Sequence, residues 1–128
     1  MLEEKVINKG KLKFIIVDDD EISQFYLIKA LNRYFKDITI ICANNGEDAV
    51  NIYHNNKDVD VILMDIRMPK MSGIEATKLI RKNNKDVIII AQTASLGNKE
   101  EYLNAGCNSY ILKPIHHEEL YKLINKYI

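Results

Sequence analysis

Five short apolar runs alternate along this chain with five longer segments in which apolar residues recur at helical spacing. The runs are rich in β-branched residues and predict strands buried on both faces, over residues 12–17, 38–43, 59–64, 87–91 and 108–112. The longer segments predict helices, over residues 18–35, 47–54, 73–82, 98–105 and 117–128. The helical spacing places Ile22 on the buried face of the first helix and Tyr127 on that of the last.

The alternation of strands and helices, with connections of only a few residues, determines the expected fold class. Each helix returns the chain to the edge of the sheet where the previous strand began, so the strands run parallel. We therefore expect an α/β fold, a (βα)5 doubly wound parallel sheet, and we take 2-1-3-4-5, one of the two common orders, as its strand order. At 128 residues the chain fits one domain over residues 11–128, after a lead-in over residues 1–10.

Asp65 is the residue of the third strand that most needs an explanation. It follows four consecutive apolar residues, where a carboxylate has no role in packing. Pro69 and Gly73 turn the chain soon afterwards, so Asp65 is expected at the carboxyl end of a central strand, facing a loop. Ligands of open α/β sheets bind at that edge, and Asp65 is therefore a candidate site residue.

Other polar residues follow the neighbouring strands and reach the same edge. Asp18 and Asp19 follow the first strand, Thr93 the fourth and Lys113 the fifth. In the expected order the first and third strands are neighbours, so three aspartates converge. Clustered carboxylates repel one another and need a cation, and their hard oxygens favour Mg²⁺ or Mn²⁺. With an ammonium and a hydroxyl beside them, they suit a phosphoryl group that one carboxylate would attack as nucleophile.

Composition narrows the function classes further. Lys plus Arg and Asp plus Glu both number 18, so no overall field attracts nucleic acid or an anionic membrane. The longest aliphatic runs reach about five residues, far below the ~20 that span a bilayer. The first ten residues lack the apolar stretch of a signal peptide, so we expect a cytoplasmic protein. Cys42 and Cys107 lack metal-ligand spacing and are expected to be free thiols at opposite sheet edges.

The residues around the strand ends, taken together and in order, resemble the receiver domain of response regulators in two-component signalling, whose fold is flavodoxin-like. The matching stretches are residues 17–19 after the first strand, 64–69 with 72–73 after the third, 93–94 after the fourth, and 105–106 with 110–114 around the fifth. Each stretch alone is weak. Together, on these elements, they are highly specific, and the resemblance covers nearly the whole chain.

The resemblance implies how the acidic residues act. Asp65 would accept the phosphoryl group from a phosphohistidine of a sensor histidine kinase or a histidine phosphotransfer protein. Asp19 and Asp65 would bind Mg²⁺ directly, together with the backbone carbonyl of Arg67. Asp18 would contact the ion through water. The chain would then catalyse only its own phosphorylation and dephosphorylation, and it would not be an enzyme acting on other substrates.

The resemblance also implies how phosphorylation is sensed. Lys113 and Thr93 would contact the phosphoryl oxygens, and the bond between Lys113 and Pro114 would be cis. Thr93 would move toward the phosphoryl group, and Tyr110 would rotate into the space it leaves. This movement would remodel the face formed by the last strand and the helices on either side of it, where an output partner would bind.

Two positions beside the phosphorylated residue vary within the family. Arg67 lies two residues after Asp65, and Ser95 lies two residues after Thr93. We hypothesise that Arg67 and Ser95 set the lifetime of the phosphoryl group, so that alanine at either position changes its decay.

Other function classes compete with this interpretation. A Mg²⁺-dependent phosphohydrolase of small molecules would use the same acyl-phosphate chemistry, but it needs a cap segment to enclose substrate, and no insertion provides one. A nucleotide or flavin binder needs a Gly- or Ser/Thr-rich phosphate loop after the first strand, where four acids stand. The sequence does not decide whether the chain is a stand-alone regulator or a receiver cut from a longer protein. Residues 65–77 resemble receivers attached to hybrid histidine kinases.

Overall fold

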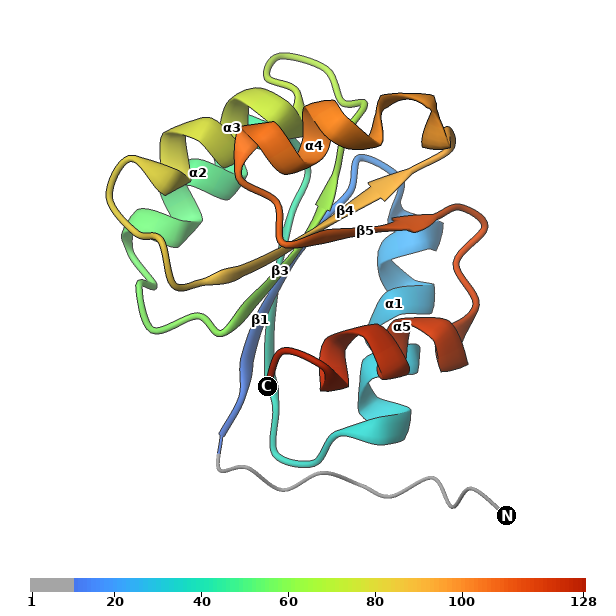
Figure 1. Ribbon diagram of the computed structural model, residues 1–128. Helices are drawn as coiled ribbons and strands as arrows, with labels where there is room; N and C mark the ends of the chain where they lie inside the picture. The colour runs from blue at the N-terminus through green and yellow to red at the C-terminus, as the bar shows by residue number, and fades with distance from the viewer. Residues whose placement is uncertain (1–10) are drawn as a thin grey trace.

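The fold is a five-stranded parallel sheet in the order β2-β1-β3-β4-β5, which confirms the expected class and order (Figure 1). The computed structural model describes residues 11–128, so the lead-in expected over residues 1–10 lies outside the described residues. The strands are β1 Lys13–Val17, β2 Thr39–Ala43, β3 Val61–Asp65, β4 Ile88–Thr93 and β5 Ser109–Leu112. The helices are α1 Glu21–Tyr34, α2 Gly46–His54, α3 Gly73–Arg81, α4 Lys99–Ala105 and α5 His117–Asn125, with a 3-10 turn η1 Leu96–Asn98 before α4.

Helices cover both faces of the sheet and create two separate cores. α2, α3 and α4 lie on one face, and α1 and α5 pack together on the other (Figure 1). Side chains alternate between the faces along each strand, so Ile62 and Met64 enter the first core while Val61 and Leu63 enter the second. All four are fully buried, which explains why this strand has no polar position before Asp65.

The predicted burial of Ile22 and Tyr127 is wrong. Ile22 is 79% exposed, because about 100° of rotation per residue turns it roughly 140° away from Leu27 on the buried stripe of α1. Tyr127 is 38% exposed, because α5 ends at Asn125 and the tyrosine lies beyond its regular turns. Its hydroxyl donates a hydrogen bond to the carbonyl of Asn108 at 3.1 Å instead.

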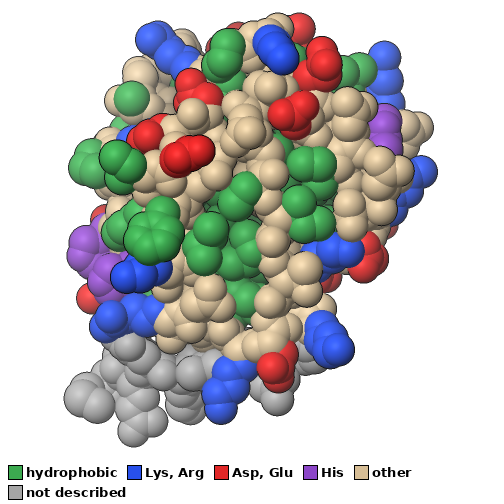
Figure 2. All heavy atoms as spheres, turned by 180° about the vertical axis from the view of Figure 1, so that it is seen from behind, with side chains coloured by type: hydrophobic (Ala, Val, Ile, Leu, Met, Phe, Trp, Pro, Cys, Tyr) green, Lys and Arg blue, Asp and Glu red, His purple; other side chains and the backbone are tan. Residues whose placement is uncertain are grey.

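The surface carries charged side chains of both signs, as the balanced composition predicts (Figure 2). Hydrophobic side chains gather in the middle of the face seen from behind, and charged side chains of both signs border them (Figure 2). Cys42 on β2 is half-buried and Cys107 before β5 is buried, and both are free thiols at opposite edges of the sheet. Within residues 11–128, no helix has the length and apolarity that crossing a membrane requires.

Candidate functional site

Asp18 and Asp19 extend from the end of β1 into the loop before α1. The N–H of Asp18 donates to the carbonyl of Ala43 on β2 at 3.0 Å, and its side chain is buried. Asp19 is exposed at the rim. Asp20 has a different role, because its carboxylate accepts from the N–H of Ile22 at 3.2 Å and so caps α1. Only the first two of these acids are therefore available to a site at the strand ends.

Asp65 is the last residue of β3, one position beyond the predicted strand end, and only 4% of it is exposed. The loop that follows folds back over it, with the N–H of Gly73 donating to the carbonyl of Ile66 at 3.0 Å. A Cβ atom on Gly73 would lie 2.1 Å from the carbonyl oxygen of Asp65, so only glycine fits there. The glycine after the proline turn thus lets α3 begin directly beside the buried acid.

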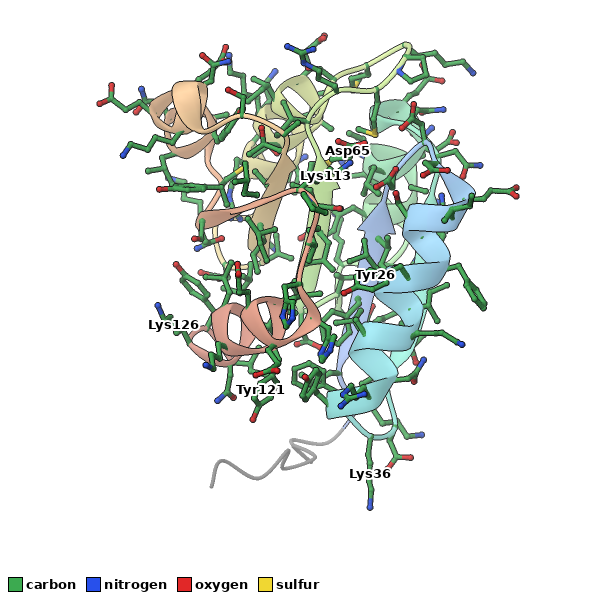
Figure 3. The ribbon with its side chains drawn as sticks, turned by 90° about the vertical axis from the view of Figure 1, so that its right-hand side faces the viewer. Tyr26, Lys36, Asp65, Lys113, Tyr121 and Lys126 are labelled. Carbon is green, nitrogen blue, oxygen red and sulfur yellow. The ribbon has the colours of Figure 1, made fainter. Side chains whose placement is uncertain are left out.

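Three carboxylates and one ammonium meet at this edge of the sheet. Oxygen atoms of Asp18, Asp19 and Asp65 all lie within 4.8 Å of one another. The Nζ atom of Lys113 lies 3.3 Å from Oδ1 of Asp65 and 3.4 Å from Oδ2 of Asp18. Figure 3 shows the side chains of Asp65 and Lys113 next to each other at the end of the sheet. The convergence expected from the strand order therefore occurs.

Lys113 reaches the acids from the end of β5. Its backbone N–H donates to the carbonyl of Thr93 at 2.7 Å, which continues the pairing of β4 with β5 by one residue. The bond between Lys113 and Pro114 is cis, as the resemblance implies. These constraints direct the ammonium back across the strand ends toward Asp65.

The electrostatics of the cluster indicate a shortage of positive charge. Burial raises the pKa of Asp65 from its ordinary 3.8 to about 6; the ammonium of Lys113 lowers it, and the carboxylates of Asp18 and Asp19 raise it. Burial alone would lower the pKa of Lys113, but Asp65 and Asp18 outweigh burial and raise it. One ammonium does not neutralise three acids, so a divalent cation with a preference for hard oxygen ligands fits this donor set.

The expected site residues share one cleft, with two exceptions. The cleft has a volume of about 760 Å³, and among the expected residues its lining includes Asp19, Asp65, Arg67, Thr93, Ser95 and Lys113. Asp18 is buried behind this lining, within reach of Lys113. Tyr110 is half-buried on β5 and packs against the core under α2, α3 and α4.

The structure also brings two residues to the site that the sequence analysis missed. Gln92 is buried on β4, and its amide donates to the carbonyls of Val17 at 3.3 Å and Leu63 at 3.1 Å. It thereby joins the ends of the two strands that carry the acids. Tyr102 of α4 lines the cleft, with its hydroxyl 2.7 Å from the hydroxyl oxygen of Thr93. A polar residue directly after the apolar run of β4, at the strand end where the other site residues lie, is the sequence signal that could have identified Gln92.

Known sequences similar to this chain include hybrid histidine kinases and response regulators. The family model of the response regulator receiver domain matches residues 14–125. Hybrid signal transduction histidine kinase G of Dictyostelium discoideum is 36% identical over a match of 132 positions, which covers 99% of this chain but 4% of that protein. Two-component response regulator 24 of Arabidopsis thaliana is 35% identical over 120 residues, covering 92% of this chain and 85% of that protein. The chain thus spans a small part of the kinase and most of the plant regulator.

Solved structures with a similar fold and at least 30% identity include two receiver domains. The receiver domain of Ssk1 from Saccharomyces cerevisiae, crystallised with the histidine phosphotransfer signalling protein Ypd1, has a TM-score of 0.83 and 36% identity, over 91% of this chain and 88% of that chain. The receiver domain of sensor histidine kinase PA1611 from Pseudomonas aeruginosa, with a magnesium ion in its active-site cleft, has a TM-score of 0.82 and 30% identity, over 92% of this chain and 98% of that chain.

Proposed function

This chain belongs to the response regulator receiver family, and we propose that it accepts a phosphoryl group on Asp65 from a phosphohistidine of a histidine kinase or a histidine phosphotransfer protein. One observation carries the proposal: three carboxylates lie within 4.8 Å at the strand ends, and the ammonium of Lys113 bridges two of them. Asp65 is the most suitable acceptor, because it is central, faces the cleft and contacts the ammonium directly.

The proposed reaction is a direct transfer between two side chains. A carboxylate oxygen of Asp65 attacks phosphorus, the new P–O bond forms as the P–N bond to the donor imidazole breaks, and the imidazole nitrogen keeps the electron pair and takes up a proton. Lys113 and the hydroxyl of Thr93 would contact the phosphoryl oxygens. Asp19, Asp65 and the carbonyl of Arg67 would hold Mg²⁺, with Asp18 acting through water. The bound ion would supply charge neutralisation for the acids and the phosphoryl oxygens.

Phosphorylation would be sensed by Thr93 and Tyr110 and read on the face formed by α4, β5 and α5. Two apolar side chains on these elements are exposed, Leu103 at 44% and Leu112 at 41%, and would contact an output partner. The phosphoryl group favours the active arrangement only through contacts that it gains there, which for such coupling amount to about 1–3 kcal/mol.

The test of the proposed function uses a small phosphodonor. The chain is incubated with Mg²⁺ and acetyl phosphate, and its intact mass is measured. A gain of one phosphoryl group is expected, and no gain would exclude the function. The competing phosphohydrolase would instead release inorganic phosphate from small esters without retaining a stable label. That class would use an Asp-x-Asp pair after β1, and Asp20, which stands two residues after Asp18, caps α1 instead.

Arg67 and Ser95 are proposed to set the lifetime of the phosphoryl group, since both are exposed and line the cleft with Asp65. Arg67→Ala and Ser95→Ala are each expected to change the first-order decay of the phosphorylated protein by about two- to tenfold, because each side chain affects the approach of water. The measurement follows loss of the label after the phosphodonor is removed. Decay equal to wild type in both variants would contradict the proposal.

The phosphodonor is proposed to dock on α1. A groove of about 590 Å³ lies between α1 and the segment after β5, and Tyr26 of α1 lines it together with Lys113. Ile22, which also lines the groove, is 79% exposed, and Phe25 on the same helix is 60% exposed. Because Lys113 lines both the groove and the cleft, a donor seated here would reach Asp65. Ypd1, a phosphotransfer protein, forms a complex with the similar Ssk1 receiver, and we propose a donor of this kind for this chain.

Ile22→Glu tests this docking surface. Phosphoryl transfer from phosphorylated Ypd1 is expected to fall about tenfold or more, because a charge would replace an apolar contact at the interface. Phosphorylation by acetyl phosphate is expected to stay near wild type, since the small donor needs no docking and an acid suits the first turn of α1. The matched control is Leu103→Glu on α4, which should accept the phosphoryl group from Ypd1 at the wild-type rate. Equal slowing with both donors, or no slowing with Ypd1, would contradict the assignment.

Two contexts for the chain fit the relatives. The match to 4% of a hybrid kinase and to 85% of a plant response regulator supports both an attached and a stand-alone receiver. We propose that the phosphoryl chemistry of Asp65 is the same in either context, because every residue assigned to it lies between Asp18 and Lys113.

A further inference from the structure

Tyr102 is a buried tyrosine of α4 whose hydroxyl reaches the end of β4. It lies on the inner side of α4, only 2% of it is exposed, and it forms part of the core under α2, α3 and α4. A buried phenol hydroxyl requires a hydrogen-bond partner. Here the hydroxyl lies 2.7 Å from the hydroxyl oxygen of Thr93 and 3.2 Å from the carbonyl oxygen of Ser95. α4 is thereby bonded directly to the end of β4.

These contacts already engage the single hydroxyl proton of Thr93. Its hydroxyl accepts from the N–H of Ser95 at 3.1 Å, lies 3.0 Å from the carbonyl oxygen of Ser95, and contacts Tyr102. A hydroxyl has one proton and two lone pairs. Either Thr93 donates to Ser95 and accepts from Tyr102, or it donates to Tyr102, which donates to Ser95. In both arrangements the single proton of Thr93 is already committed, so none is left for a phosphoryl group on Asp65.

We infer that Tyr102 is a positioning residue that holds Thr93 in the unphosphorylated arrangement and links its release to α4. This inference rests on the proposed role of Thr93 as a phosphoryl contact. When Thr93 moves toward the phosphoryl group and donates its proton there, its hydroxyl leaves that of Tyr102 and the bond between them breaks. The tyrosine hydroxyl can then donate to the Ser95 carbonyl, which already lies 3.2 Å away, so no buried polar group is left unpaired. The Tyr102 to Thr93 bond therefore stabilises only the inactive arrangement.

This arrangement adds a second reporter of phosphorylation beside Tyr110. Tyr110 would respond by moving into space that Thr93 leaves, on β5. Tyr102 would respond by losing a hydrogen bond. Because it lies in the middle of α4, that loss would loosen the attachment to β4 of the short helix that carries exposed Leu103. The position of Tyr102 thus makes α4 sensitive to the state of Thr93 without any movement of Tyr110.

Tyr102→Phe tests the inference, because it removes the hydroxyl and keeps the ring. The measurement is the affinity for beryllofluoride with Mg²⁺, a stable mimic of a phosphoryl group on a carboxylate. The variant is expected to bind about two- to tenfold more tightly than wild type. The bond to Thr93, specific to the inactive arrangement, is lost, whereas in the active arrangement water can replace the tyrosine hydroxyl on the carbonyl of Ser95, an exposed residue. A residue needed only for packing would give unchanged or weaker binding when altered, and either result would overturn the inference.

Two further variants make the result specific. Tyr53→Phe removes the hydroxyl of another fully buried tyrosine, on α2, and is expected to leave the affinity at the wild-type value. In a Thr93→Val background, Tyr102→Phe should not increase the affinity for beryllofluoride, because the hydrogen bond that it removes is already absent. A gain that persists there would overturn the inference. Failure of the wild type itself to bind beryllofluoride would instead overturn the proposed function, and with it the role assigned to Tyr102.

Discussion

Asp65→Asn is expected to abolish phosphorylation by acetyl phosphate and, in metal-free buffer, to stabilise the protein near neutral pH. The first effect follows because an amide lacks the nucleophilic carboxylate oxygen. The second follows from the pKa of Asp65, which burial raises to about 6 in the folded protein from an ordinary 3.8. Between these values the native state binds more protons than the unfolded state, so wild-type stability falls as pH rises from about 4 through 6.

The stability of Asp65→Asn relative to wild type should therefore increase as the pH rises. Near pH 4 the Asp65 carboxyl is largely protonated, and wild type and variant should be similar. Above pH 6 the variant should be more stable by about 1–3 kcal/mol, because it no longer carries a buried negative charge beside two other acids. Urea unfolding at both pH values measures this difference.

Exposed Asp86 on the loop before β4 offers a matched control. Asp86→Asn should be phosphorylated like wild type and should show no comparable gain in stability at pH 7. A stabilised Asp65→Asn variant also excludes misfolding as the reason for its lost phosphorylation. Undiminished labelling of the variant, or a loss of stability above pH 6, would contradict the role of Asp65.

The second large effect is expected for Asp19→Asn, which removes one of the acids proposed to hold Mg²⁺. We expect Mg²⁺ affinity, measured by calorimetry, to fall about tenfold or more, because a neutral amide attracts the ion less than a carboxylate does. The rate of phosphorylation at a low Mg²⁺ concentration should fall with it, by about 10- to 100-fold, and chelation of the ion should stop phosphorylation of the wild type.

Asp20 lies next to Asp19 in the chain and serves as its control. Its carboxylate caps α1 through Ile22 and the hydroxyl of Ser23. Asp20→Asn keeps an acceptor for the cap and should leave Mg²⁺ affinity close to wild type. If Asp19→Asn and Asp20→Asn lower the affinity for Mg²⁺ equally, the effect comes from the overall negative charge of the region, and the assignment of Asp19 as a ligand is wrong.

The fold was predictable because its strands are buried on both faces. Val61 and Leu63 on one face and Ile62 and Met64 on the other produce an apolar run with no alternation, and only a sheet covered by helices on both sides explains it. The candidate site was predictable for a related reason, since parallel strands bring their carboxyl ends to one edge. Asp18, Asp19, Asp65 and Lys113 therefore meet wherever the strand order is 2-1-3-4-5.

Side-chain orientation within a helix was less predictable. Ile22 belongs to the apolar pattern of α1 but lies in its first turn, rotated away from the stripe centred on Leu27 and Leu31. Tyr102 fits the apolar pattern of α4 and looks like an ordinary core residue, because sequence does not reveal where a buried hydroxyl points. Only the distance of 2.7 Å to Thr93 identifies it as part of the site.

The position of the phosphoryl group in the chain tests the assignment of Asp65 as its acceptor. Wild-type protein is phosphorylated with acetyl phosphate and Mg²⁺, reduced with sodium borohydride and analysed by peptide mass mapping. Reduction converts an aspartyl phosphate to homoserine, so homoserine is expected at position 65 and at no other aspartate. Homoserine at Asp18 or Asp19, or a stable label on a histidine or serine instead, would contradict the assignment.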